Sequence, residues 1–151
     1  MASVLADIQT NAQAKPAVRT KANRLHGRIR VFQATVTPAA AVAIGETITW
    51  GSLPVGARVL GHLSKLYFSA GAASSTINLG DAVSAARHLA ATSITSAGSA
   101  VPEAASADGA QFETTDASTA ATNNCTLIST VAGADIPAGQ VLTLTVAYVV
   151  D

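Results

Sequence analysis

The sequence predicts an all-β domain, a sandwich or a barrel, with a basic N-terminal arm. Several short segments alternate apolar and polar side chains and are separated by turn residues, a pattern typical of these folds. The segments do not alternate with convincing helices, which disfavours a parallel α/β sheet. A chain of 151 residues fits one domain, and it can bury a core without the help of a metal or a disulfide.

The chain is poor in charge. Charged residues make up 12% of it, against about 25% in an average globular domain. Because free monomers usually keep charge on their surface for solubility, this composition favours an assembly that covers much of the surface. A small alanine-rich domain with a Ser/Thr surface is the alternative.

No segment predicts a membrane span or a secretory signal. No apolar run approaches the roughly 18 residues that a span needs, and residues 1–15 lack a basic segment before their short apolar piece. We therefore expect synthesis in a cytoplasm and no membrane partner. Cys125 is the only cysteine, which excludes an internal disulfide.

The charges that are present divide the chain. Residues 1–30 have a net charge of +5 and residues 31–151 have a net charge of −5. We expect residues 1–27 to form a basic arm and residues 28–151 to form the β domain. The arm has too few large apolar residues for a core, but a short helix that starts at Pro16 and ends before Gly27 is compatible with its pattern.

The basic residues of the arm and of the first strand are the candidate contact residues. A solvated, disordered tail is the simplest alternative. Nucleic acid is disfavoured as a partner because the arm has no aromatic residue to stack on bases, so an acidic protein surface is favoured. The candidates are Lys15, Arg19, Lys21, Arg24, Arg28 and Arg30.

Alternation locates most of the strands. Residues 28–36 are rich in β-forming side chains, residues 42–50 alternate with a kink near Gly45, and residues 125–131 form a further strand. A turn at residues 137–140 precedes the last strand. That strand has the cleanest pattern, with a core face of Leu142, Leu144, Val146, Tyr148 and Val150.

The segment from Trp50 to Asp81 contains a long strand, a turn at residues 71–75 and a returning strand. Its apolar residues change parity in the first strand, which predicts a bulge between His62 and Lys65. A strand buried on both faces is the alternative.

The region after Asp81 has a weaker pattern. Residues 82–91 read either as a short helix, because they are rich in alanine, or as an irregular edge strand. We expect Gln111–Thr115 to form a short strand anchored by Phe112. The Asp81 carboxylate is expected to cap a turn, and Arg58 and Arg87 are candidates for ion pairs between subunits.

No motif predicts catalysis, a cofactor or a metal. His26, His62 and His88 lack ligand spacing, whereas a zinc site needs three or four converging ligands, and His62 is interpreted as a partly buried strand residue. Calcium could bind oxygen ligands in the loop that holds Asp108, Glu113, Asp116, Asn123 and Asn124, but a solvated acidic loop is favoured because EF-hand spacing is missing.

Four segments resemble small head proteins of tailed bacteriophages. They read LPVGARVLGHLSKLYFSA (53–70), INLGDA (77–82), AARHLAAT (85–92) and IPAGQVLTLTVAYVV (136–150). The resemblance is to capsid cement, or decoration, proteins with a jelly-roll or related β-sandwich fold, and it covers about residues 28–151. His88 stands where an aromatic residue is more usual, and the basic arm is not part of the pattern.

The resemblance implies a single jelly-roll-like β-sandwich with a structural role. Such a protein sits on the outer surface of an icosahedral head, contacts the major capsid protein and forms a homo-oligomer, a dimer or a trimer. It is made in the bacterial host cytoplasm and is not an enzyme. Binding would stabilise the assembled shell by mass action, and the arm would extend the footprint over neighbouring subunits.

Two other functions stay open. A β-sandwich receptor- or glycan-binding module of a phage fibre would need an aromatic platform, for which Trp50 and Phe112 are the candidates. A protein that binds DNA through its arm would do so with a steep dependence on salt.

Overall fold

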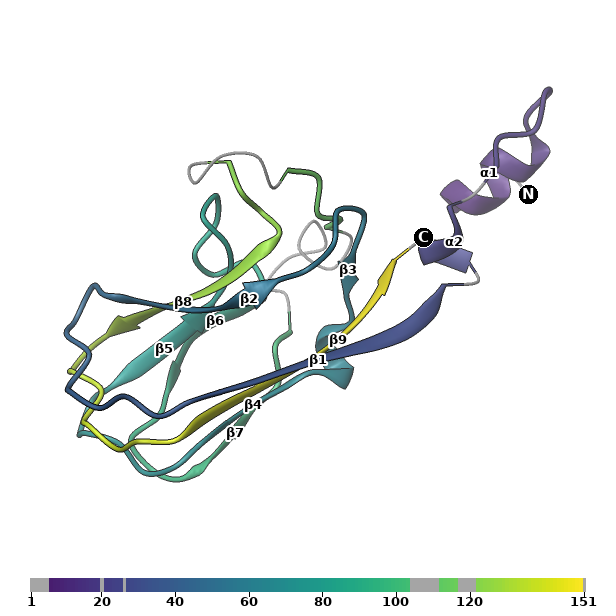
Figure 1. The fold of residues 1–151 in the computed structure, drawn as a ribbon. Helices are drawn as coiled ribbons and strands as arrows, with labels where there is room; N and C mark the ends of the chain where they lie inside the picture. The colour runs from purple at the N-terminus through teal and green to yellow at the C-terminus, as the bar shows by residue number, and fades with distance from the viewer. Residues whose placement is uncertain (1–5, 20, 26, 104–111, 117–121, 151) are drawn as a thin grey trace, which may run out of the picture.

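The computed structural model describes residues 6–19, 21–25, 27–103, 112–116 and 122–150. These residues form two antiparallel sheets that face each other (Figure 1). The strands are β1 (Arg28–Val36), β2 (Thr47–Ser52), β3 (Arg58–Val59), β4 (Lys65–Phe68), β5 (Thr76–Leu79), β6 (Leu89–Ser93), β7 (Gly98–Ala100), β8 (Thr126–Ala132) and β9 (Leu142–Val150).

The strand order is that of a jelly roll. One sheet has the order β1-β9-β4-β7, with the short β3 also beside β9, and the other has the order β2-β8-β5-β6. Apart from β3, the first strand pairs with the last, the second with the second last, and so on inwards. Such pairing folds one long antiparallel ribbon into two four-stranded sheets. The predicted all-β sandwich is confirmed.

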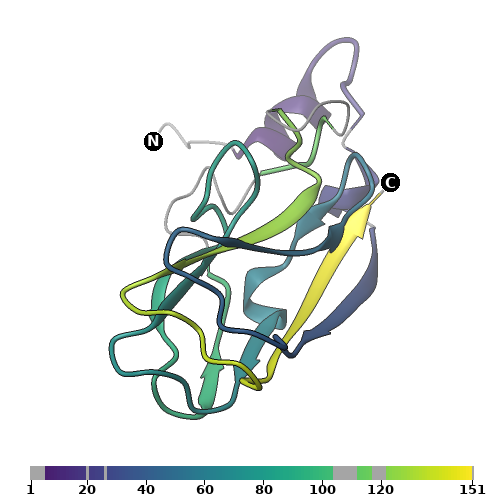
Figure 2. The same cartoon turned by 60° about the vertical axis from the view of Figure 1, so that its left-hand side comes forward.

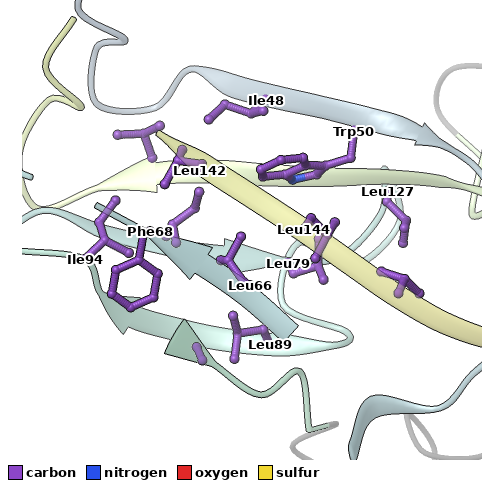
Figure 3. Close-up of a cluster of buried hydrophobic side chains, with 14 of the residues drawn as sticks. Ile48, Trp50, Leu66, Phe68, Leu79, Leu89, Ile94, Leu127, Leu142 and Leu144 are labelled. Carbon is purple, nitrogen blue, oxygen red and sulfur yellow. The ribbon is translucent and has the colours of Figure 1, made fainter. Parts of the chain in front are cut away.

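The core lies between the two sheets and is built mainly from leucine, isoleucine and valine (Figure 3). Leu66, Leu142 and Leu144 of the first sheet are fully buried, and so are Ile77 and Leu79 of the second. Trp50 reaches in from β2, and its Nε1 donates a hydrogen bond of 2.8 Å to Ser129 Oγ of the neighbouring β8. The largest aromatic side chain therefore packs in the core without leaving its N–H unpaired.

We expect Ser129→Ala to lower the free energy of unfolding by about 2 kcal/mol, because the buried indole N–H of Trp50 loses its acceptor. Ser52→Ala is the matched control: Ser52 Oγ lies 2.8 Å from Thr126 Oγ1 on the same pair of strands, but at an exposed position, so its cost should stay within about 0.5 kcal/mol. Urea denaturation of both variants measures the difference. If both variants lost the same free energy of unfolding, the buried hydrogen bond would contribute no more to stability than the exposed one.

The last strand follows its predicted pattern for only part of its length. Leu142, Leu144 and Val146 are buried, and beyond them Ala147 and Val149 are buried as well, while Tyr148 and Val150 pack at the margin of the core. The register with β1 runs from one end to the other without a shift. The end of β9 is therefore covered on both of its faces.

The predicted bulge after His62 is replaced by a 3₁₀ turn, η1 (Gly61–Leu63), which separates β3 from β4. The turn closes with a hydrogen bond of 2.9 Å from Ser64 N–H to Gly61 C=O. A bulge and a 3₁₀ turn both reverse the side of the strand to which the following side chains point. The sequence pattern therefore located the irregularity correctly and predicted the wrong conformation for it. His62 is exposed in this turn and is not the partly buried strand residue that we expected.

A turn also replaces the first half of the strand predicted for residues 42–50. Gly45 has a φ of +87°, a conformation that glycine adopts without strain. Glu46 N–H donates to Ala43 C=O, and the Glu46 carboxylate accepts from Ala43 N–H. Strand β2 therefore begins at Thr47, beyond this turn.

The turn at residues 71–75 is present, but it does not close a hairpin. The strands on either side of it, β4 and β5, lie in opposite sheets. Of the two readings of residues 82–91, the extended one is correct, since a bend after Asp81 leads into β6 at Leu89. The predicted turn at residues 137–140 is confirmed by a hydrogen bond from Gln140 N–H to Pro137 C=O.

The predicted strand Gln111–Thr115 is only partly visible, because Gln111 lies outside the described residues. Residues 112–116 form no regular strand. Thr114 nevertheless exchanges backbone hydrogen bonds with the segment before β3, donating to Ala57 C=O (2.9 Å) and accepting from Gly56 N–H (2.7 Å). These bonds fix the segment against the sandwich.

The arm contains two short helices, α1 (Asp7–Gln13) and α2 (Ala22–Leu25). The short helix starting at Pro16, with which the pattern was compatible, does not form, because residues 16–19 are not helical. Figures 1 and 2 show the arm projecting beyond the sandwich at the end where β1 begins and β9 finishes. No helix among the described residues is long and apolar enough to cross a membrane.

Candidate interaction surface

The predicted contact residues do not converge on one site. Lys15, Arg19, Lys21 and Arg24 lie along the arm, whereas Arg28 and Arg30 belong to β1, where they stand opposite Val150 and Tyr148 of β9. All six are exposed. They form a basic line that starts in the arm and continues onto the first strand of the sandwich.

The arm is anchored to the sandwich at its root. Helix α2 contacts β9, and Lys21 Nζ lies 2.7 Å from Glu113 Oε1. The Lys21 side chain is 59% exposed, so solvent screens this ion pair and limits it to at most about 1 kcal/mol. Such a contact can orient the arm and still be exchanged for a contact with another protein.

Asp81 is the centre of a polar cluster beside the segment that holds Glu113. Its Oδ1 accepts hydrogen bonds from the backbone N–H groups of Val83 and Ser84, each 2.8 Å long, which confirms the predicted turn cap. Its other oxygen accepts from the Arg87 guanidinium, so Arg87, a candidate for an ion pair between subunits, pairs within its own chain instead. The guanidinium in turn lies 3.7 Å from the centroid of the Phe112 ring.

His88 follows this cluster and is 4% exposed. Burial lowers the pKa of its imidazole from 6.5 to about 4; the Asp81 carboxylate opposes this shift and the Arg87 guanidinium adds to it. The side chain is therefore neutral at pH 7. It serves as a packed part of the sandwich, at the position where the resemblance expects an aromatic residue.

The two asparagines of the suspected calcium loop are used to close turns. Asn124 Oδ1 accepts from the backbone N–H groups of Thr115 and Asp116, at 2.8 and 3.0 Å. Asn123 Oδ1 caps the start of β8. Asp108 lies outside the described residues, and among those that are described no group of three potential ligands could hold a metal ion.

The aromatic residues named for glycan binding have other roles. Trp50 is 6% exposed and its indole N–H is engaged by Ser129. The Arg87 guanidinium lies over the Phe112 ring in a cation–π contact. Trp50 is therefore no open platform for a sugar, and the Phe112 ring already has the Arg87 guanidinium over one face.

The exposed side of β1 is the feature that the sequence reasoning missed. Ile29 and Val31 are 57% and 65% exposed on the outer face of the sheet, although both are large and apolar. On the same face, Thr35 and Thr143 join their hydroxyl groups at 2.9 Å and Gln33 reaches Thr145. The sequence did contain a signal for this face: residues 28–36 have apolar side chains at both odd and even positions. A strand with one face in solvent should have apolar side chains on only one of its two faces.

Comparison with known proteins found a similar fold among solved structures. No protein-family model and no curated protein matches the chain. Among solved structures, a chain of the "Cyanophage Pam1 capsid asymmetric unit" is similar, with 22% sequence identity and a TM-score of 0.64. The match covers 93% of this chain and 96% of that one. The two chains therefore share a fold along almost their whole lengths.

Proposed function

We propose that this chain is a structural protein of a tailed-phage virion, a capsid cement protein that binds the outside of an icosahedral head. The observation that carries the proposal is the shared fold with a chain of a cyanophage capsid, which extends over 93% of this chain and so includes more than a common sandwich core. The residues quoted from 53–70, 77–82, 85–92 and 136–150 support the same class.

The partner in this proposal is the major capsid protein, and binding stabilises contacts between its subunits. A protein that binds only the assembled shell shifts the equilibrium towards that shell by mass action. The charge-poor surface suits this role, because surfaces that are covered by partners need little charge for solubility. The protein acts without catalysis or a cofactor, is made in the host cytoplasm and ends on the outer surface of the virion.

Residues 1–27 supply a second contact in addition to that of the sandwich, residues 28–151. A second contact on the same chain adds to affinity through its high effective concentration. The arm suits this task because its backbone projects beyond the sandwich (Figure 1) and its basic side chains are exposed. An acidic stretch on neighbouring capsid subunits is the complementary surface.

Co-sedimentation with heads of the phage that carries this gene tests the proposal. We expect saturable binding of the wild type, and at least tenfold weaker binding when Lys15, Arg19, Lys21 and Arg24 are all replaced by serine. Lys65→Ser is the control, because Lys65 is an exposed base outside the arm, on β4, which β9 separates from β1 in the sheet. Absence of saturable binding by the wild type would refute the cement role, whereas undiminished binding of the fourfold variant would refute only the role of the arm.

A further inference from the structure

The edge of β1 differs from the other sheet edges of the molecule. Natural sheets protect their edges with short strands, bulges, prolines or charges, because an open edge pairs with other strands. Strand β7 has three residues, and β2 and β6 pair with their neighbours through shifted registers. Strand β1 has nine residues in an unbroken register, contains no proline, and carries charge only at Arg28 and Arg30.

The backbone groups that β1 turns outwards can be identified from its partner strand. Ala147 of β9 stands opposite Val31, but its C=O accepts from Leu60 N–H (2.8 Å) and its N–H donates to Ser64 Oγ (3.0 Å). Both groups thus point away from β1. Since bonded and non-bonded pairs alternate in an antiparallel ladder, the outward N–H and C=O groups of β1 belong to Ile29, Val31, Gln33 and Thr35.

We infer that this edge is an interface on which a second copy of the chain pairs its own β1, antiparallel, about a two-fold axis at Phe32. This register sets Ile29 opposite the partner's Thr35 and Val31 opposite the partner's Gln33, so every outward N–H and C=O of both strands finds a partner. No like charges meet in it. The half-buried Phe32 side chains of the two copies lie next to each other at the axis, where aromatic cross-strand pairs are favourable.

Charge complementarity favours a second copy over any other strand. The first end of β1 is basic, because it carries Arg28 and Arg30. The connection that follows the other end is acidic: it contains Glu46, and the Asp135 carboxylate accepts a hydrogen bond of 3.0 Å from its Ile44 N–H. These two ends are about 30 Å apart, the length of nine strand residues. Antiparallel pairing places the basic end of each copy beside the acidic end of the other, so the attraction occurs twice.

The direction of the side chains agrees with this arrangement. Arg28 and Arg30 share the parity of Phe32, which packs against the core, so they leave β1 on the side of the second sheet. The connection from β1 to β2 crosses between the sheets on that same side (Figure 1), so the partner's own connection would lie on the side to which Arg28 and Arg30 point. The dimer would contain one continuous sheet across both copies, with Ile29 and Val31 of both on its outer face.

Sedimentation velocity over a range of protein concentrations tests the inference on the isolated protein, independently of any binding to heads. We expect a reversible dimer that weakens as salt rises, because salt screens the terminal charges. Gln33→Pro removes one outward N–H and no backbone hydrogen bond to β9, and a proline is tolerated at such an edge position. Like Gln33→Ala, it also loses the side-chain hydrogen bond of 3.4 Å to Thr145 Oγ1. It should weaken the dimer at least tenfold, while Gln33→Ala, which keeps that N–H, should leave the dimer intact.

Hydrogen exchange of the β1 amides is a second measurement that needs no variant. In the dimer, the amides of Ile29, Val31, Gln33 and Thr35 should become protected as the concentration rises, while those of the alternate residues are protected throughout by β9. A protein that stays monomeric, a trimer, or a dimer that forms equally well with Gln33→Pro would overturn the inference. Protection of these amides only in the presence of heads would show that a capsid strand is the occupant instead.

Discussion

Asp81→Ala should lower the free energy of unfolding by about 3–5 kcal/mol, the cost of breaking a buried ion pair by removing one partner. The Asp81 side chain is fully buried and that of Arg87 is 16% exposed, so the remaining guanidinium would be left in the protein with the Phe112 ring as its neighbour. The two backbone N–H groups that Asp81 caps would lose their acceptor as well. For a chain of this size the loss corresponds to a decrease in Tm of roughly 10 °C or more.

Asp135→Ala is the matched control for this variant. Asp135 also accepts a backbone hydrogen bond, from Ile44 N–H, but at an exposed position, so its loss should cost no more than about 1 kcal/mol. Asp81→Asn separates the two contributions, because an amide oxygen can still cap the turn and cannot neutralise Arg87. Thermal unfolding that gave Asp81→Ala and Asp135→Ala the same Tm would show that the buried pair does not hold this region together.

The fold class followed from alternation, which reports directly on which side of a strand is buried. Strands β8 and β9 and the turn at residues 137–140 could be located in this way, and so could the break near His62. The form of that break could not, since a bulge and a 3₁₀ turn both shift the parity of the side chains that follow. The separation of β4 and β5 into opposite sheets was equally hidden, because strand pairing depends on contacts between distant parts of the chain.

The candidate surface was only partly accessible to sequence reasoning. Local chemistry predicted the Asp81 cap, since a short carboxylate binds backbone groups of its own turn. The partner of Arg87 was missed, although it lies six residues earlier across the same turn. The edge of β1, which no strand among the described residues covers, left no signal of its own, because an edge strand and a central strand can have the same residues and differ only in what lies beside them.

Acid should weaken the fold through His88, over a pH range set by two pKa values. In the unfolded chain the imidazole binds a proton near pH 6.5, while in the native protein burial lowers its pKa to about 4. Between these values the unfolded state holds more protons, so stability falls as the pH falls. The loss should reach about 2 kcal/mol at pH 5 and about 3 kcal/mol at pH 4, relative to pH 7.5, where His88 is neutral in both states.

Urea denaturation at pH 7.5 and pH 5 measures this loss, and His88→Gln should remove most of it because glutamine does not titrate. His62→Gln is the control for the substitution itself, since it replaces an exposed histidine, in η1. If His88→Gln proves too unstable to measure, the NMR titration of wild-type His88 decides the matter. An imidazole that takes up its proton near pH 6.5 in the native protein would mean that His88 is not the acid-sensitive part of the sandwich.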